Sequence, residues 1–232
     1  MNKLVCFHLF NDFSGSPKVL RIVVGGLVKK GIAIDIITSK GKGALSDLDG
    51  QKGIRMSQYT YRFSDNSAVT MIRYCCVQLY IFLLAFRYLF SRNTIFYINT
   101  ILPVGAALAG KLMGKRVVYH YHEDAGTKGG FYRLLAEIMQ KLASEIICVS
   151  EYQRFYLKRK KGVYVVPNAV PKTFVEQLKV NSQEAFERKR VLMLGSLKEY
   201  KGTREFIELA ETLKEYTFEL VLNETAENIV AF

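Results

Sequence analysis

The stretch 190-RVLMLGSLKEYKGTREFIELAETLKEYTFELVLN-223 is the clearest indication of the fold that we expect for this chain. It begins with an apolar run, continues through a glycine turn and an amphipathic segment, and ends in a second apolar run. This order of strand, helix and strand is typical of the opening βαβ unit of a nucleotide-binding domain. The sequence ends nine residues later, so it predicts one whole domain followed by the first unit of another.

Upstream of that unit, short apolar runs alternate with segments of helical periodicity. The run 145-EIICV-149 is continuously apolar, which favours a parallel sheet that is buried on both faces. We therefore predict an α/β fold with a Rossmann-like, doubly wound parallel sheet over residues 1–170. A polar linker over 171–189 and a partial βαβ unit over 190–232 complete the predicted organisation.

The two strands of this last unit are apolar enough for the centre of a sheet, and a single helix cannot cover both of their faces. We therefore expect the last unit to dock on the first domain, to pair with another chain, or to be poorly ordered. The possible partners of the chain thus include a second copy and a separate donor-domain chain.

Turn residues mark where the helices of the first domain begin and end. Pro17 suits the first turn of a helix whose cap is Ser14 or Ser16. Gly31 should end that helix, and Ser150 should cap a later one.

The chain is basic, with 33 Lys and Arg against 21 Asp and Glu and a net charge of +12. Residues 1–150 hold 19 basic and 9 acidic side chains, so most of the excess lies in the first domain. Such an excess suggests a phosphate-bearing ligand, nucleic acid or anionic lipid, or serves solubility alone. We find no recognised nucleic-acid-binding module and expect no nucleic-acid partner.

The four cysteines show no spacing typical of a metal site, and three of them lie in apolar runs. Free thiols of this kind fit a reducing cytosol. The chain passes from Met1 directly into a strand-like run, so we expect no secretory leader and a cytoplasmic location.

The stretch from Thr70 to Phe90 is apolar but contains Arg73 and Arg87. Its uncharged run between these arginines is shorter than the roughly twenty residues that a bilayer requires. We predict a buried or partly membrane-facing helix, and hence a peripheral site at the inner face of the cell membrane. The cationic run 158-KRKK-161 would either meet anionic lipid or form a solvated turn.

The turn formed by Ser14, Gly15 and Ser16 follows the first strand and precedes the first helix. Backbone N–H groups at a helix N-terminus favour a phosphate, and glycine lets the backbone approach it closely. The alternative is an ordinary βα turn. The G-x-G-x-x-G dinucleotide fingerprint is not present here, which argues against a nicotinamide-dependent oxidoreductase.

The segment 117-VVYHYHEDA-125 places two histidines and two carboxylates at the carboxyl end of a strand, where open α/β sheets bind ligands. His120 and His122 share a side if the strand continues. A neutral histidine could then hydrogen-bond a sugar hydroxyl, with Glu123 or Asp124 orienting it. A zinc site would need a third ligand at suitable spacing, which we do not find. The remaining alternative is a capping turn with exposed histidines.

In the second unit, Gly195 and the Lys201-Gly202 pair flank the strand-to-helix turn. A lysine at a helix N-terminus opposes the helix dipole, and this cost is often accepted where an anion binds. Otherwise Lys201 is a solvated side chain.

Taken together, these residues resemble the retaining group-1 glycosyltransferases of GT-B architecture. Five segments carry the resemblance in order, namely 10-FNDFSGSPKVL-20, 117-VVYHYHED-124, 143-ASEIICVSEYQRFYL-157, 165-VVPNAV-170 and 191-VLMLGSLKEYKG-202. The resemblance implies two facing Rossmann domains with the active site in the cleft between them. It also implies that the first domain binds the acceptor and the second binds a nucleoside diphosphate sugar as donor, with no further cofactor.

The resemblance assigns roles to single residues. Gly15 would face the donor diphosphate, His122 would contact the transferred sugar, and Lys201 would grip the diphosphate. Glu123 stands where Asp is usual in the family, so Asp124 would take that part. Ser196 stands where many members have an arginine, for which Lys198 would compensate.

The acidic Glu-x7-Glu region of the family's donor domain would lie beyond Phe232. We therefore expect a glycosyltransferase that acts on a polysaccharide or lipid-linked acceptor, with little activity from this chain alone. The alternative is a non-catalytic module that keeps affinity for an acceptor or a membrane.

Overall fold

The computed structural model describes residues 3–170, 174–177, 189–197, 201–222 and 229. The chain divides into two compact units, Met1–Pro171 and Lys172–Phe232. Most of the predicted linker, 171–189, lies outside the described residues.

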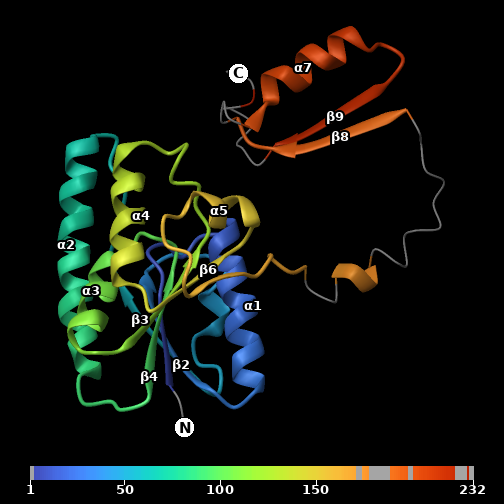
Figure 1. The fold of residues 1–232 in the computed structure, drawn as a ribbon. Coiled ribbons are helices and arrows are strands. Elements are labelled where there is room, and N and C mark those ends of the chain that lie inside the picture. The colour runs from blue at the N-terminus through green and yellow to red at the C-terminus, as the bar shows by residue number, and fades with distance from the viewer. Residues whose placement is uncertain (1–2, 171–173, 178–188, 198–200, 223–228, 230–232) are drawn as a thin grey trace. The chain divides into compact units, whose positions relative to one another are not determined.

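The first unit is built on a sheet of seven parallel strands (Figure 1). The strands are β1 (Lys3–Phe7), β2 (Ala33–Ser39), β3 (Ile54–Tyr59), β4 (Thr94–Asn99), β5 (Arg116–Tyr121), β6 (Glu145–Cys148) and β7 (Val163–Val165). Their order is β3-β2-β1-β4-β5-β6-β7, the order of a Rossmann sheet. The predicted α/β class is confirmed, and the strand order reverses between β1 and β4.

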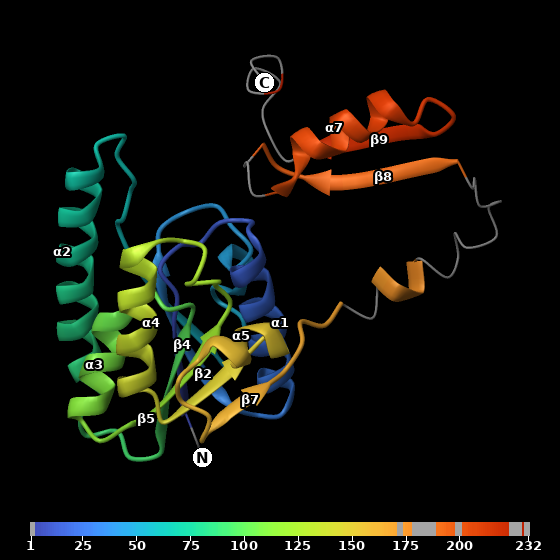
Figure 2. The ribbon, with the colours of Figure 1, turned by 45° about the horizontal axis from the view of Figure 1, so that its top comes forward.

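Helices cover both faces of this sheet (Figures 1 and 2). They are α1 (Gly15–Lys29), α2 (Ser67–Ala85), α3 (Val104–Leu112), α4 (Gly130–Leu142) and α5 (Glu151–Tyr156), with 3-10 turns η1 (Ser46–Leu48) and η2 (Phe86–Tyr88). Val77, Ala106 and Met139 bring α2, α3 and α4 into the larger apolar core. Leu20 and Val24 of α1 belong to a second core, which contains other side chains of the same sheet.

The residues that end the helices act largely as their chemistry predicts. Ser14 occupies the cap position of α1, although its side chain makes no capping hydrogen bond. Gly31 follows α1 with a φ of 75°, a conformation that favours glycine. The Ser150 hydroxyl accepts a hydrogen bond from the Gln153 N–H at 3.3 Å, which confirms the predicted cap of α5.

Helices α2 and α3 approach each other closely at Gly105. The Gly105 N–H donates to the Gln78 side-chain carbonyl at 2.9 Å. A Cβ atom at position 105 would lie 2.1 Å from the Gln78 backbone oxygen. Only glycine therefore allows this helix pair to pack as it does.

The cationic run 158–161 is bonded to the protein itself. Arg159 donates from its guanidinium to the carbonyls of Ala143 and Ser144, both at 2.6 Å, just beyond the end of α4. Lys158 forms an ion pair with Glu137 of α4 at 2.8 Å. These contacts give the run a part in holding β7 and α4 together.

The second unit contains the predicted βαβ arrangement, with β8 (Arg190–Gly195), α7 (Thr203–Thr212) and β9 (Thr217–Leu222). The two strands are parallel neighbours, and Gly202 precedes α7 with a φ of 73°. The side chains of Leu192 and Leu194 are exposed, the latter by 72%. One face of the strand pair thus carries apolar side chains open to solvent, as the shortage of covering helices predicts.

Candidate functional site

The topology brings all three histidines of the sequence to one place on the first unit. His8 directly follows β1, while His120 and His122 lie at the end of β5. Strand β4 runs between β1 and β5, and its last residue, Asn99, pairs in register with His120. The histidines therefore meet at the carboxyl edge of the sheet, beside the point where strand order reverses and where such sheets bind ligands.

Asn99 connects the histidines to the first helix. Its Nδ2 donates to the Ser16 carbonyl at 3.1 Å, and because a carbonyl only accepts, this bond sets the orientation of the amide. The same Nδ2 lies 3.0 Å from His8 Nδ1, and the amide oxygen lies 3.0 Å from His122 Nε2. His122 must then carry its proton on Nε2, which leaves Nδ1 as a hydrogen-bond acceptor.

His8 has two competing contacts at the same nitrogen. Its Nδ1 is 3.0 Å from Asn99 Nδ2 and 3.4 Å from the Asn99 carbonyl, and the two contacts require different tautomers. The shorter contact has the better hydrogen-bond distance, so His8 Nδ1 accepts from Asn99. The side chain is buried, in agreement with the prediction that His8 packs at the strand end.

His120 lies beneath His122 and is itself buried. The two rings are 4.1 Å apart between centroids, which confirms that both side chains share one side of the strand. Burial raises the pKa of Tyr97, so its hydroxyl stays protonated and donates to His120 Nδ1 at 2.5 Å. His120 thus supports the ring of His122, and its predicted contact with a substrate stays a prediction.

All three imidazoles are neutral at pH 7. Burial lowers the pKa of His8 to about 4 and that of His120 to about 4. Burial, together with the neighbouring His120 and His8, lowers the pKa of His122 to about 3. The cluster therefore offers a hydrogen-bond acceptor to a hydroxyl group and does not carry a positive charge.

The predicted phosphate turn lies on the other side of the Asn99 bridge. Ser14 donates from its N–H to Asp12 Oδ1 at 2.9 Å, and Gly15 is the first residue of α1. A Cβ atom at Gly15 would meet no heavy atom within 4 Å. The space over the Gly15 backbone is open, and no residue within the first turn of α1 is acidic. The Asp12 carboxylate just before the helix already accepts from the Ser14 N–H and hydroxyl.

The carboxylates of Glu123 and Asp124, which follow His122, lie in different surroundings. Glu123 is only 7% exposed, and its Oε2 accepts from the N–H groups of Ile101 and His122, each at 3.3 Å. Burial raises the pKa of Glu123. This geometry favours a part in bracing the loop, and the predicted contact of Glu123 with substrate stays a prediction.

Asp124 is half-buried and accepts from the Gly126 N–H at 3.0 Å. It lines a pocket of about 250 Å³ that α4 and α5 also line, with Arg133 and Lys158 among its residues. Among the described residues, His122 is hydrogen-bonded through its ring to Asn99 and not to Asp124. The catalytic role assigned to Asp124 stays a prediction.

The predicted residues of the second unit lie around its strand-to-helix turn. Gly195 ends β8, and the Ser196 carbonyl accepts from the Thr203 hydroxyl at 3.1 Å. Lys201 precedes the left-handed Gly202 at the start of α7. Lys198 lies outside the described residues. The donor-binding roles of these residues stay predictions.

A pocket of about 400 Å³ adjoins the histidine cluster, and sequence reasoning missed it. Leu9 and Phe10, which follow His8, are part of its wall, as is Leu102, three residues beyond Asn99. Six aromatic residues line it, namely Phe10, Tyr61, Phe63, Tyr74, Phe131 and Tyr132. The rings of Phe10 and Phe63 stack at 4.6 Å between centroids. Such a pocket suits the face of a sugar ring or an apolar chain.

Asn99 was also missed, although it ends an apolar strand beside the predicted switch point. The aromatic alternation at Tyr59, Tyr61 and Phe63 is the one signal in the sequence that could have indicated the pocket. Among the described residues, no group of three or more His, Cys, Asp or Glu side chains could hold a metal ion.

Comparison with known proteins identifies the family of the first unit. Residues 13–174 match the protein family described as Glycosyltransferase Family 4. No curated protein sequence matches this chain.

Solved structures share the fold at low identity. HepE from Anabaena, solved in complex with UDP and glucose, is 17% identical with a TM-score of 0.63, and the match covers 100% of this chain and 64% of that one. A glycosyltransferase from Rickettsia africae is 17% identical with a TM-score of 0.62, over 95% and 60% of the two chains. A UDP-N-acetylglucosamine 2-epimerase from Rickettsia bellii is 13% identical with a TM-score of 0.60, over 99% and 64%.

The chain thus spans less than two thirds of the length of these structural relatives. At such identities they establish the fold, and the family match covers more than half of the sequence. Both agree with the resemblance of the five sequence segments. This chain therefore belongs to glycosyltransferase family 4, a family of retaining enzymes of GT-B architecture.

Proposed function

We propose that this protein takes part in transferring a sugar from a nucleoside diphosphate sugar to a saccharide or lipid-linked acceptor. The observation that carries the proposal is the hydrogen-bonded path from Ser16 through Asn99 to His122. This path joins an open helix N-terminus, suited to a phosphate, to a neutral histidine acceptor, suited to a sugar hydroxyl. A nucleoside diphosphate sugar presents those two groups next to each other.

Each part of the site would have its own task. The backbone at Gly15 would approach the diphosphate and stabilise the charge that develops as the glycosidic bond breaks. His122 Nδ1 would accept a hydrogen bond from a hydroxyl of the transferred sugar and so orient its ring. The aromatic pocket would hold the acceptor beside them. Lys201 of the second unit is the residue that we propose for further neutralisation of the diphosphate.

Variants of Gly15 and His122 distinguish phosphate binding from sugar binding, because they should weaken different sets of ligands. UDP-glucose, the first donor to test, should raise the melting temperature of the protein, and UDP should do so too. Gly15→Ala should weaken both ligands by about tenfold, because its methyl group would stand between backbone and phosphate. His122→Ala should weaken only UDP-glucose, by about fivefold, since it removes one neutral hydrogen bond to the sugar.

Thermal-shift titrations of the wild type and the two variants measure these effects, with GDP-mannose as a second donor. Gly26→Ala, at another open glycine of α1, is the matched control and should leave both affinities unchanged. If neither donor nor UDP stabilises the protein, the proposal is wrong and the non-catalytic module is favoured. Equal weakening of UDP and UDP-glucose by His122→Ala would contradict the role given to His122.

A further inference from the structure

Helix α2 is apolar on the side that faces solvent as well as on the side that faces the core. Its inner side buries Tyr74, Val77 and Ile81. On its outer side Leu79 and Leu83 are each 60% exposed. A surface helix normally presents polar side chains outward, so an apolar outer face indicates that something covers it.

The exposed side chains form a continuous stripe along the helix. Ala68, Ile72, Cys75, Cys76, Leu79 and Leu83 are exposed and follow one another at helical spacing. At 1.5 Å per residue the stripe is about 23 Å long. Helix α3, which packs against α2 at Gly105, adds exposed Leu108 and Leu112. We call these eight side chains the α2–α3 face.

The charge of the surrounding sequence indicates what kind of partner covers this face. Residues 66–122 contain no Asp or Glu, and they contain six basic side chains: Arg73, Arg87, Arg92, Lys111, Lys115 and Arg116. The only charged residue of α2 is Arg73, and the only one of α3 is Lys111. An apolar surface whose own two helices carry cations and no carboxylate complements an anionic lipid bilayer.

Helix α2 is attached to the rest of the domain along its inner side. Among the described residues, the segment Ser67–Tyr88 alone has the length and hydropathy of a membrane span, with a mean hydropathy of 1.8. The Gln78–Gly105 bond and the Tyr74 hydroxyl, which donates to the Leu102 carbonyl at 2.7 Å, attach its inner side to α3 and the loop before it.

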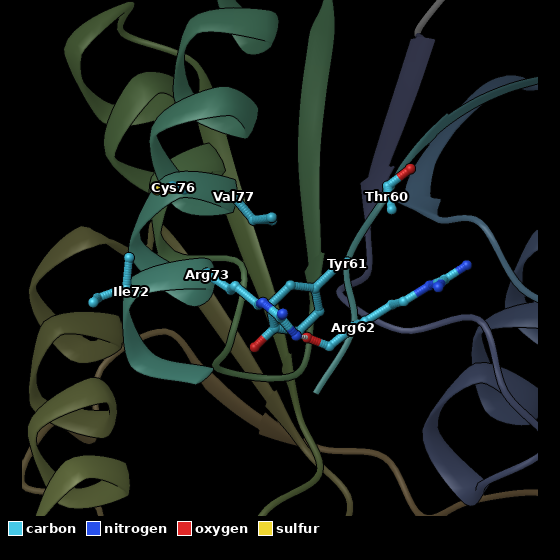
Figure 3. A pocket seen from close by; sticks show the side chains of 7 residues that line it. All are labelled: Thr60, Tyr61, Arg62, Ile72, Arg73, Cys76 and Val77. Atoms are coloured by element: carbon cyan, nitrogen blue, oxygen red, sulfur yellow. Dashed lines mark hydrogen bonds between the residues drawn. The ribbon is translucent and has the colours of Figure 1, made fainter. Parts of the chain in front are cut away.

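Arg73 adds a third attachment, near the start of the helix. It reaches across a groove of about 410 Å³ and donates to the carbonyls of Arg62 and Phe63. Figure 3 shows Arg73 extending toward Tyr61, while Ile72 points to the opposite side of the helix. The helix therefore stays on the domain and presents only its outer side.

A second copy of the chain fits this face less well than a bilayer does. A symmetric dimer would bring the same surface of each copy together. Since neither helix carries a carboxylate, the cations of α2 and α3 would then meet no opposite charge on the same two helices of the other copy.

We propose that the α2–α3 face docks on an anionic lipid membrane, with α2 lying in the plane of the interface. This surface is separate from the histidine cluster, and its function does not depend on the proposed sugar transfer. Lipid would cover the apolar side chains, while Arg92 and Lys111 would meet phosphate groups of the lipid.

Vesicle flotation tests the apolar part of the proposal. The wild type should float with vesicles of phosphatidylcholine and phosphatidylglycerol and much less with phosphatidylcholine alone. Leu79→Gln combined with Leu83→Gln should lower the partition coefficient by about tenfold or more. The matched control is Ile22→Gln on α1, which covers the opposite face of the sheet and exposes 40% of Ile22. It should float like the wild type.

The electrostatic part is tested by neutralising cations. Arg92→Gln and Lys111→Gln should each lower partition into the phosphatidylglycerol vesicles by about fivefold and leave partition into pure phosphatidylcholine unchanged. Raising the salt concentration should reduce the difference between the two vesicle types. Equal floating with both vesicle types at low salt would overturn the anionic part of the proposal.

Native cysteines give a readout that needs no substitution. Cys75 and Cys76 are exposed on the face, whereas Cys6 and Cys148 are buried. Anionic vesicles should slow the alkylation of Cys75 and Cys76 by a membrane-impermeant maleimide by about tenfold, because the thiols enter the interface. Undiminished alkylation of floated protein would show that another surface binds the lipid.

Sedimentation velocity without lipid tests whether a second copy of the chain, and not lipid, covers the α2–α3 face. A dimer that the Leu79→Gln and Leu83→Gln variant dissociates, in a protein that binds neither vesicle, would overturn the proposal in favour of a second copy. A monomer that binds neither vesicle would overturn it as well.

Discussion

Replacing Gly105 by alanine will lower the free energy of unfolding by about 3 kcal/mol or more. The new Cβ would lie 2.1 Å from the Gln78 backbone oxygen and 2.9 Å from its carbonyl carbon. Backbone atoms within a helix cannot rotate away as a side chain can, so α2 and α3 must separate. That movement would also strain the buried hydrogen bond from the Gly105 N–H to Gln78.

Urea unfolding followed by circular dichroism measures this loss, and thermal unfolding should show a melting temperature lower by about 6–12 °C. Gly26→Ala is the control, because a Cβ atom there meets nothing within 4 Å. That change should stabilise α1 by roughly 0.5–1 kcal/mol through its helix propensity. Unfolding of both Gly105→Ala and Gly26→Ala like the wild type would contradict the close contact between α2 and α3.

Lowering the pH from 6.5 to 4 should destabilise the first unit strongly. Unfolded histidines take up protons near pH 6.5, whereas His8 and His120 stay neutral in the folded protein down to about 4 and His122 down to about 3. In this window the unfolded state binds more protons, so the free energy of unfolding falls as the pH falls. His8 and His120 should each account for about 3 kcal/mol of the loss.

Glu123 acts in the opposite direction. Its pKa is raised by burial, so the folded state binds its proton more readily than the unfolded state, and acidification through that pKa adds stability. Glu123→Gln keeps an oxygen for the N–H groups of Ile101 and His122 but removes the titration. The stability of this variant should therefore fall more steeply with acid than that of the wild type.

Urea titrations at several pH values measure the slope, and NMR of the histidine rings tests its cause directly. The sequence holds only three histidines, so the three sets of ring signals should all be those of neutral imidazole at pH 5.5. A ring that titrates near pH 6.5 in the folded protein would refute the buried, uncharged cluster.

Local chemistry predicted the elements of the first unit well. The continuously apolar strands, the glycine after α1 and the serine before α5 each act through their nearest neighbours along the chain, so their effect can be recognised without knowing the fold. The shared side of His120 and His122 follows from the alternation of a strand, and the ring contact confirms it.

Asn99 shows why the rest of the site could not be predicted. A polar residue at the end of a strand is common, and its importance arises only because β4 lies between β1 and β5. The partners of Asn99 are 83 residues away at Ser16 and 91 residues away at His8. The aromatic pocket could not be predicted for the same reason, because its rings come from loops and helices that are separate in the sequence. Likewise, the apolar pattern of α2 predicted a helix but could not show which of its sides the core would bury.

The exposed leucines of the β8–β9 pair have a practical consequence for handling the protein. Within the part of the chain that the structure describes, β8 and β9 pair only with each other. Apolar side chains beside the edge of so short a strand pair invite other chains to add to it, and this is a common origin of aggregation. Concentrated stocks should therefore become turbid on storage, and Leu194→Lys should keep them clear.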